Sequence, residues 1–160
     1  MENKSTLVKF SVIMPTYNNA AFIRRAIISL LRQSFSDWEL IIINDGSTDD
    51  TYLRIKDFLN DSRIRYVENE VNRGLGVALN RGIEQAKYEY IAYLPADDFY
   101  YTNHLENLAI KFQNSPDVIL AFSGIKYEHS DSLSYAVNTE TKHIRPSYPL
   151  QLVQTAHKKT

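Results

Sequence analysis

Short apolar runs alternate along this chain with segments whose apolar residues recur at helical spacing. The apolar runs predict strands over residues 9–14, 39–43, 64–68, 90–94 and 118–122. The helical spacing predicts helices over about residues 19–32, 49–60, 75–87 and 103–113. Strands that alternate with helices are typical of βαβ units, in which helices cover both faces of a mostly parallel sheet. The pattern therefore predicts an α/β fold of three layers, α/β/α.

Two stretches refine this picture. The third predicted helix carries Ala78, Gly82 and Ala86 on one side, so we expect it to lie close to the sheet. After residue 128 the alternation fades, and residues 129–149 are polar and include two prolines. We therefore expect one domain over residues 1–128 and an irregular segment over residues 129–160.

Composition narrows the class of protein. With 160 residues and 44% hydrophobic residues, the chain is long enough for one domain with an apolar core. A net charge of −1 provides no basic surface for nucleic acid, so we expect no nucleic-acid partner. The absence of cysteine excludes disulfides and thiolate metal sites and fits the reducing cytoplasm. No apolar run approaches the roughly 20 residues of a transmembrane helix, and no signal peptide is recognisable.

Two adjacent carboxylates, Asp97 and Asp98, directly follow the apolar run 90–94. Open α/β sheets bind ligands beyond the carboxyl ends of their strands. Carboxylate oxygens there suit Mg²⁺ or Mn²⁺ carrying a substrate diphosphate. An Asp-Asp pair is also common in surface turns, but its position, together with a second acidic turn at residues 44–47, favours a site.

The ends of the first two predicted strands carry further candidates. After the first strand come Pro15, Thr16 and Tyr17, whose hydroxyl and ring are placed to meet a nucleobase, and then Asn19, which we interpret as a helix N-cap. Asp45 follows the second strand. Its ionised carboxylate only accepts hydrogen bonds, so it can receive the imide N–H of uracil or thymine. An Asx-type turn closed by glycine is the alternative, and both interpretations can hold at once.

The glycines at 74, 76 and 82 fit neither the dinucleotide fingerprint nor the phosphate-binding P-loop. Arg73 and Arg81 are able to pair with a diphosphate, although arginines at such positions are usually solvated. No two histidines stand four residues apart on a helix, and there is no G-x-S-x-G elbow. A zincin-type metal site and a hydrolase triad are therefore unsupported.

Four blocks of sequence now point to a family. They are FSVIMPTYN at residues 10–18, ELIIINDGSTDDT at 39–51, NRG at 72–74 with NRGI at 80–83, and YIAYLPADD at 90–98. In this order they resemble the nucleotide-sugar half of family-two glycosyltransferases, which have the GT-A fold with its Rossmann-like nucleotide-binding half. The resemblance covers about residues 8–128, and the segment 129–160 would then begin the acceptor-binding half.

The resemblance assigns roles to individual residues. It implies that Thr16, Tyr17 and Asp45 contact the base, that Asp97 contacts the ribose, and that Asp98 holds the Mg²⁺ or Mn²⁺ ion bridging the diphosphate. Pro15, Asn72, Gly74, Asn80 and Arg81 complete the expected nucleotide-sugar site.

The resemblance also implies an activity. The expected reaction is inverting transfer from a nucleotide-diphosphate sugar, a UDP-sugar above all, to a hydroxyl of a saccharide or a lipid-linked saccharide. Such transfer serves the synthesis of cell-envelope polysaccharide or glycoconjugates. The expected location is the cytoplasm, including peripheral association with the inner face of the membrane.

Two departures from the family pattern matter. The family often has Asp-Ala-Asp-Asp where this chain has Pro-Ala-Asp-Asp at residues 95–98, so one acidic group of its DXD motif region is absent. The family's general base lies in the acceptor-binding half, which places it beyond Thr160. We therefore expect this chain to bind donor and to transfer sugar poorly or not at all.

Two other functions compete with transfer. One is a donor-binding module without turnover, because the acceptor half and the general base are absent. The other is a nucleotidyltransferase, which would require a glycine-rich, basic loop after the first strand, whereas residues 15–19 are neither.

Overall fold

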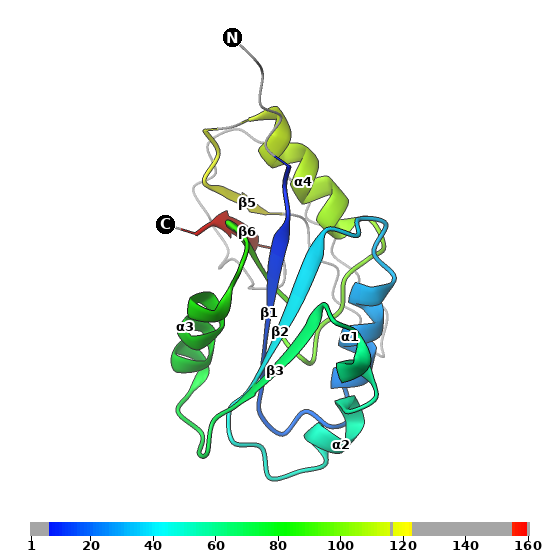
Figure 1. Ribbon diagram of the computed structural model, residues 1–160, viewed down its shortest axis with the longest axis vertical. Coiled ribbons are helices and arrows are strands. Elements are labelled where there is room, and N and C mark those ends of the chain that lie inside the picture. Colours follow the sequence, from blue (N-terminus) through cyan, green and yellow to red (C-terminus); the bar gives the residue numbers. More distant parts are fainter. Residues whose placement is uncertain (1–6, 116, 123–154, 160) are drawn as a thin grey trace, which may run out of the picture.

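The computed structural model describes residues 7–115, 117–122 and 155–159 (Figure 1). The elements follow one another as β1 (Phe10–Thr16), α1 (Ile23–Leu31), β2 (Trp38–Asn44), α2 (Thr51–Ile55), the 3₁₀ turn η1 (Phe58–Asn60), β3 (Ile64–Glu68), α3 (Leu75–Gln85), β4 (Tyr90–Tyr93), α4 (His104–Asn114), β5 (Leu120–Phe122) and β6 (Thr155–Lys158). The strands form one sheet in the order β3-β2-β1-β4-β6-β5. β1 pairs in parallel with β2 and β4, and β2 with β3, whereas β6 is antiparallel to β4 and β5. The predicted α/β fold with a mostly parallel sheet is confirmed.

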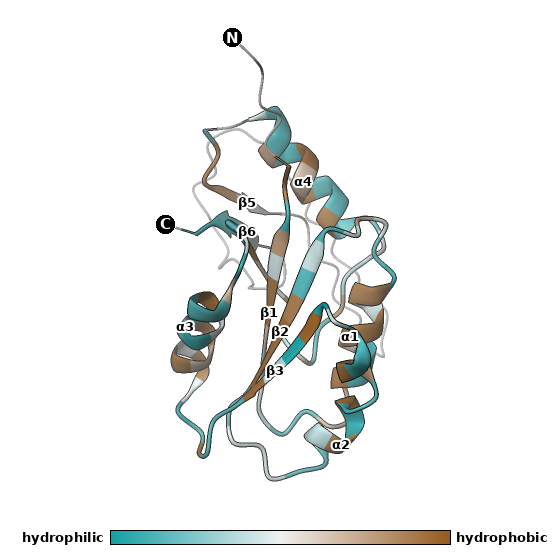
Figure 2. Ribbon diagram, in the orientation of Figure 1, coloured by the Kyte–Doolittle hydropathy of each residue, from teal (hydrophilic) through white to brown (hydrophobic). Residues whose placement is uncertain are grey.

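Helices cover both faces of the sheet, so the core has two halves (Figure 1). On one face, Phe10, Val12 and Leu40 pack against the apolar sides of α1 and α4. On the other face, the residues Ile13 and Ile41 pack toward α3. All residues of β1 and β2 are buried, which explains why most of their residues are apolar (Figure 2).

The close approach of α3 to the sheet is confirmed at Gly82. A Cβ atom on this glycine would lie 2.4 Å from Cγ2 of Ile13 in β1. A side chain there would overlap a branched core residue, so the missing Cβ sets how near α3 lies to the strands.

The first predicted helix is shorter than expected. α1 begins at Ile23 with Phe22 as its N-cap residue, so Asn19 is not the N-cap. The Asn19 carbonyl accepts the N–H groups of Phe22 and Ile23 in the turn that leads into the helix.

The second predicted helix, 49–60, is interrupted: α2 ends at Ile55 and η1 follows. Arg24 binds the Arg54 carbonyl at 2.7 Å, which a continuous helix would pair with the N–H of Phe58. The remaining predicted elements agree with the structure to within two residues at each end.

The strand β6 was not predicted. The sequence indicated irregular structure over residues 129–160, yet residues 155–158 pair with both β4 and β5. This strand has a single apolar residue, Ala156, so it produces no apolar run. The prediction for residues 129–149 lies outside the described residues. Among the helices of the described residues, none is long and apolar enough to cross a membrane.

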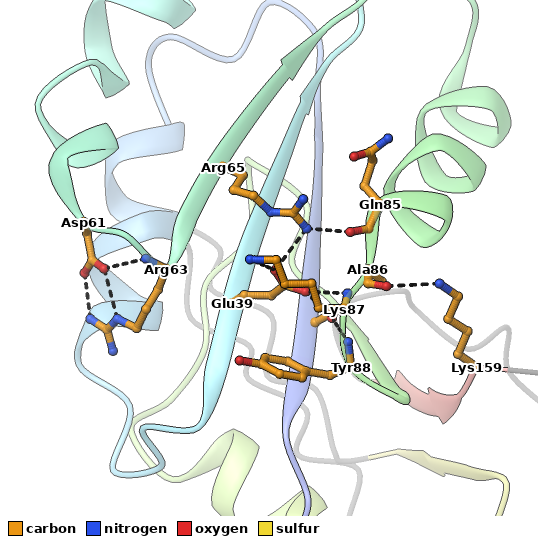
Figure 3. A network of polar contacts seen from close by, with 10 residues as sticks. Glu39, Asp61, Arg63, Arg65, Gln85, Ala86, Lys87, Tyr88 and Lys159 are labelled. Carbon is orange, nitrogen blue, oxygen red and sulfur yellow. Dashed lines mark hydrogen bonds and ion pairs between the residues drawn. The ribbon is translucent and has the colours of Figure 1, made fainter.

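A buried charge organises the end of the sheet opposite to the strands' carboxyl ends (Figure 3). The Glu39 carboxylate in β2, 3% exposed, accepts hydrogen bonds from the Ser11 hydroxyl at 2.7 Å, the Lys87 N–H at 2.7 Å and the Arg65 guanidinium at 3.0 Å. Arg65 also donates to the Gln85 carbonyl. These contacts offset the free-energy cost of burying the charge. They also fix where α3 ends and β4 begins.

The packing of α3 generates a first prediction. Gly82→Ala should lower the free energy of unfolding by about 1–3 kcal/mol, because the new methyl group overpacks against Ile13. Gly76→Ala, on the same helix but with no atom within 4 Å of its added Cβ, should instead stabilise the chain by up to about 1 kcal/mol. Urea unfolding of both variants measures the difference. Stabilisation of both to the same extent would contradict the close packing.

Candidate functional site

A hollow of about 490 Å³ opens at the carboxyl ends of β1, β2 and β4. Its lining consists of Pro15, Thr16, Tyr17, Asn19, Asp45, Asn72, Gly74, Leu75, Ala78, Pro95, Asp97 and Asp98. The structure thus brings together all the residues predicted for the site except Asn80 and Arg81. This is the edge at which an open α/β sheet binds its ligands.

Asn80 and Arg81 lie elsewhere. They line a neighbouring hollow of about 630 Å³ together with Glu68, Asn69 and other polar residues of β3, α3 and the loop between them. Arg81 donates to the Glu68 carbonyl at 2.8 Å and to the side-chain oxygen of Asn69. Its guanidinium is therefore engaged in holding the loop after β3, and the structure does not bring it to the hollow that contains Asp97 and Asp98.

Asp45 joins the end of β2 to the loop before α3. Its carboxylate, in a residue 4% exposed, accepts hydrogen bonds from the Asn69 amide at 2.6 Å, the Gly74 N–H at 2.7 Å and the Arg73 N–H at 3.0 Å. Burial alone would raise the pKa of Asp45, but these hydrogen bonds, aided by the Arg73 charge, outweigh it and lower the pKa below its usual value. The carboxylate stays ionised and keeps accepting capacity toward the hollow.

Asn44, and not Asp45, holds the turn that follows β2. The side-chain oxygen of Asn44 accepts the Ser47 N–H at 3.1 Å and the Ser47 hydroxyl at 2.5 Å. Gly46 closes this turn with a φ of +73°, and a Cβ there would lie 2.6 Å from the carbonyl carbon of Val71. Asp45 itself is thereby left to face the loop 69–74.

The loop that carries Tyr17 is held by the loop after β2. The Asn18 N–H donates to the Ser47 hydroxyl at 2.9 Å, and the Asn18 side-chain oxygen accepts the Thr48 N–H at 2.8 Å. The Asp49 carboxylate accepts the Ala20 N–H at 2.9 Å. These contacts fix the backbone beside Tyr17, a residue that is 44% exposed and lines the hollow.

Thr16 presents a polar group without a protein partner. The residue is 3% exposed, and within the described part of the chain its hydroxyl has no hydrogen-bond partner. Because an unmade hydrogen bond in a buried position costs free energy, this hydroxyl is suited to bind a polar group of a ligand in the hollow that it lines.

The carboxylates of Asp97 and Asp98 sit in the turn after β4. The Asp98 N–H donates to the Pro95 carbonyl at 3.1 Å, and Arg25 of α1 donates to the Asp97 carbonyl at 3.0 Å. Asp97 is exposed and Asp98 half-buried. Burial raises the pKa of the Asp98 carboxyl, the charge of Asp97 raises it further, and Arg25 opposes them.

This pair fits a divalent cation. The two carboxylates repel each other, and burial adds to the cost of the Asp98 charge, so an ion that binds there would relieve both. Among the described residues, no group of three or more His, Cys, Asp or Glu side chains could hold a metal ion. The other ligands would therefore be substrate oxygens and water, which is how Mg²⁺ usually binds at phosphate sites.

Some residues of the site were not predicted from the sequence. Leu75 and Ala78 line the hollow from the first turn of α3, and their side chains carry no chemical signal. Asn69, which binds Asp45, directly follows the end of β3. Its position, a polar residue at the carboxyl end of a parallel strand, is the signal that could have identified it.

The geometry agrees with what comparisons with known proteins show. The chain belongs to glycosyltransferase family 2, whose family model matches residues 11–157. It is 38% identical over 96 residues to an Escherichia coli protein, UDP-Glc:alpha-D-GlcNAc-diphosphoundecaprenol beta-1,3-glucosyltransferase WfgD, covering 60% of this chain and 38% of the relative. The first curated relatives, glycosyltransferases of Rickettsia species, are longer, and the chain spans between 17% and 46% of their length.

Solved structures show the same fold. TarS residues 1–349 from S. aureus, crystallised with UDP-GlcNAc, superposes with a TM-score of 0.72 at 26% identity, covering 79% of this chain and 37% of the TarS 1–349 chain. The mannosyltransferase PcManGT from Pyrobaculum calidifontis, in complex with GDP-Man and Mn²⁺, superposes with a TM-score of 0.66 at 26% identity, covering 74% of this chain and 36% of the PcManGT chain. The predicted GT-A fold and membership of family two are confirmed.

The hydrogen bonds to Asp45 lead to a prediction about stability. Asp45→Asn should lower the free energy of unfolding by about 1–3 kcal/mol at pH 7, because one oxygen becomes an amide that faces N–H donors. The folded-state pKa is depressed, so this stability is present above the unfolded pKa of about 3.9 and is lost as pH falls through the lower folded value. The difference in the free energy of unfolding between the parent chain and Asp45→Asn should therefore shrink below about pH 4.

Urea unfolding between pH 3 and pH 7 checks this. Asp50→Asn, an exposed position outside the hollow, provides the charge-matched control. A deficit for Asp45→Asn that is the same at both ends of this pH range would contradict the role of the ionised carboxylate.

Proposed function

We propose that the hollow binds a nucleotide-diphosphate sugar, with uridine as the nucleoside and a Mg²⁺ or Mn²⁺ ion at the diphosphate. One observation carries the proposal: a single hollow combines the ionised Asp45, the buried hydroxyl of Thr16 and the carboxylates of Asp97 and Asp98. Asp45 and Thr16 suit the edge of a base. Asp97 suits a ribose, and Asp98 suits a metal-bound diphosphate.

Each residue would have a defined role. Asp45 would accept the imide N–H of uracil, while Thr16 and Tyr17 would contact the same base. Asp97 would bind the ribose and Asp98 the cation. Pro15, Asn72 and Gly74 would complete the wall of the hollow. Asn80 and Arg81 would act on the donor only through the loop 69–74 that Arg81 supports.

The reaction that we propose is inverting transfer of the sugar to an acceptor hydroxyl. The bond from the acceptor oxygen to the anomeric carbon would form as the bond to the diphosphate oxygen breaks, and the departing diphosphate would keep the electron pair. The proton of the acceptor hydroxyl would pass to a carboxylate that acts as general base. A bound divalent cation would neutralise the charge that develops on this leaving group. We assign no general base to the described residues.

The comparisons support a donor and an acceptor class. UDP-GlcNAc in the TarS structure and UDP-Glc in the name of the E. coli relative favour a uridine donor. The diphosphoundecaprenol acceptor of that relative favours a lipid-linked saccharide, and with it work at the cytoplasmic face of a membrane in cell-envelope synthesis. Mn²⁺ in the PcManGT complex favours a divalent metal.

Metal dependence is the first prediction from this proposal. The parent chain should bind UDP at least about tenfold more tightly with Mn²⁺ than with a chelator, and Asp98→Ala should remove this difference. Isothermal titration calorimetry measures both. Asp37→Ala makes the same charge change just before β2, at a residue outside the hollow whose side chain is 45% exposed, and should behave as the parent. Equal affinity of the parent chain with and without Mn²⁺ would refute metal-assisted binding.

Base recognition is the second prediction. Asp45 should favour uracil, whose N3 donates a hydrogen bond, over cytosine, whose N3 only accepts. Asp45→Asn should weaken UDP binding in the folded fraction by about 1–3 kcal/mol and should weaken CDP binding much less. Titration of both nucleotides separates the two roles of Asp45. If both lose affinity equally, the residue only holds the loop 69–74.

A further inference from the structure

One side of α1 carries polar side chains that face the segment after Asp97. Arg25, Ser29 and Gln33 are spaced by four residues, so they share one side of α1 and of the turn that ends it. We call these three residues the α1 polar ridge. The apolar residues of the helix, among them Ile23 and Ile27, are buried in the core instead. No residue of the ridge lines either hollow.

Gln33 makes two hydrogen bonds to the segment 97–105. Its side-chain nitrogen donates to the Tyr101 carbonyl at 2.7 Å, and its side-chain oxygen accepts the Leu105 N–H at 3.0 Å. The Leu105 N–H lies in the first turn of α4, where helical N–H groups have no partner within their own helix. One side-chain amide, two residues beyond the end of α1, therefore caps α4 and binds the chain that leads into it.

Ser29 and Arg25 hold the same segment closer to the acidic pair. The Ser29 hydroxyl accepts the Tyr100 N–H at 3.0 Å and donates to the Ala26 carbonyl at 2.7 Å. Arg25 donates to the Asp97 carbonyl at 3.0 Å, and its guanidinium lies 4.9 Å from the centre of the Phe99 ring.

These contacts give the segment partners for its backbone polar groups. Residues 97–103 form neither helix nor strand, so their polar backbone groups need partners from outside the segment. On its other side, the buried Tyr100 donates its hydroxyl to the Tyr93 carbonyl at the end of β4 at 2.6 Å. The turn with Asp97 and Asp98 is thus held between β4 and the α1 polar ridge.

α1 also begins only a few residues after Tyr17, so one helix joins the loop on the base side of the hollow to the turn on its acidic side. We propose that the α1 polar ridge positions the Asp97–Asp98 turn for metal binding, with Gln33 as the central positioning residue. This inference rests on the proposed function, because it assigns the metal to that turn.

Two variants test the inference. Gln33→Leu keeps the size of the side chain and removes its hydrogen bonds, and Ser29→Ala removes the hydroxyl at a helical position that favours alanine. Gln113→Leu is the matched control, because it makes the same exchange at an exposed position of α4. Amide hydrogen exchange over residues 97–105 and UDP affinity with Mn²⁺ and with a chelator are measured for each protein.

We expect exchange of the Tyr100 amide in Ser29→Ala, and of the Leu105 amide in Gln33→Leu, to speed up about fivefold or more. The gain in UDP affinity from Mn²⁺ should fall about tenfold in both variants, while the affinity measured with the chelator stays within about twofold of the parent. Such a split separates positioning of the metal turn from a general loss of structure, which would weaken both affinities together. Gln113→Leu should match the parent in every measurement.

Three results would overturn the inference. Exchange over 97–105 that equals the control would show that the ridge does not order the turn, whether or not nucleotide binds. Faster exchange together with an unchanged gain in UDP affinity from Mn²⁺ would show that the order of the turn does not affect metal binding. Equal weakening with and without Mn²⁺ would show general loosening. Failure of the proposed function is distinct, because it would be seen in the parent chain as the absence of any Mn²⁺ effect.

Discussion

Parallel pairing of β1 with both β2 and β4 is the constraint on which the site depends. In this pairing Thr16 lies opposite Asn44 and Ile13 opposite Tyr93, so the three strands end at one edge of the sheet. The segments that follow them must leave from that edge, and they carry Tyr17, Asp45 and Asp98 into one hollow. The burial of every residue in β1 makes this arrangement costly to alter.

The loops at this edge are ordered by polar side chains rather than by apolar packing. Asp45 accepts three N–H groups of the loop 69–74, and Asn18 exchanges hydrogen bonds with the loop after β2. Gln33 and Ser29 do the same for the turn after β4. All of these contacts except that of the Asn69 side chain with Asp45 satisfy a backbone group that regular structure leaves without a partner. The site is therefore built from a rigid sheet and from loops that side chains fasten to one another.

Much of this could be predicted from the sequence, because the signals are local. Buried parallel strands appear as apolar runs, and chemically active residues such as Asp45 and Asp98 directly follow them. The long-range contacts could not be predicted. Nothing local indicates that Arg24 binds the Arg54 carbonyl near the end of α2, or that residues 155–158, with one apolar side chain, add a strand between β4 and β5. The placement of Arg81 outside the main hollow likewise follows from its contact with the loop after β3.

The central claim is that one hollow binds both the base and the metal-bound diphosphate. A crystal structure of the chain with UDP and Mn²⁺ tests it most directly. The account predicts uracil beside Thr16 and Asp45, and Mn²⁺ within about 2.3 Å of an Asp98 oxygen and bound to the diphosphate. Nucleotide in the neighbouring hollow lined by Asn80 and Arg81, or Mn²⁺ on carboxylates other than Asp97 and Asp98, would contradict it.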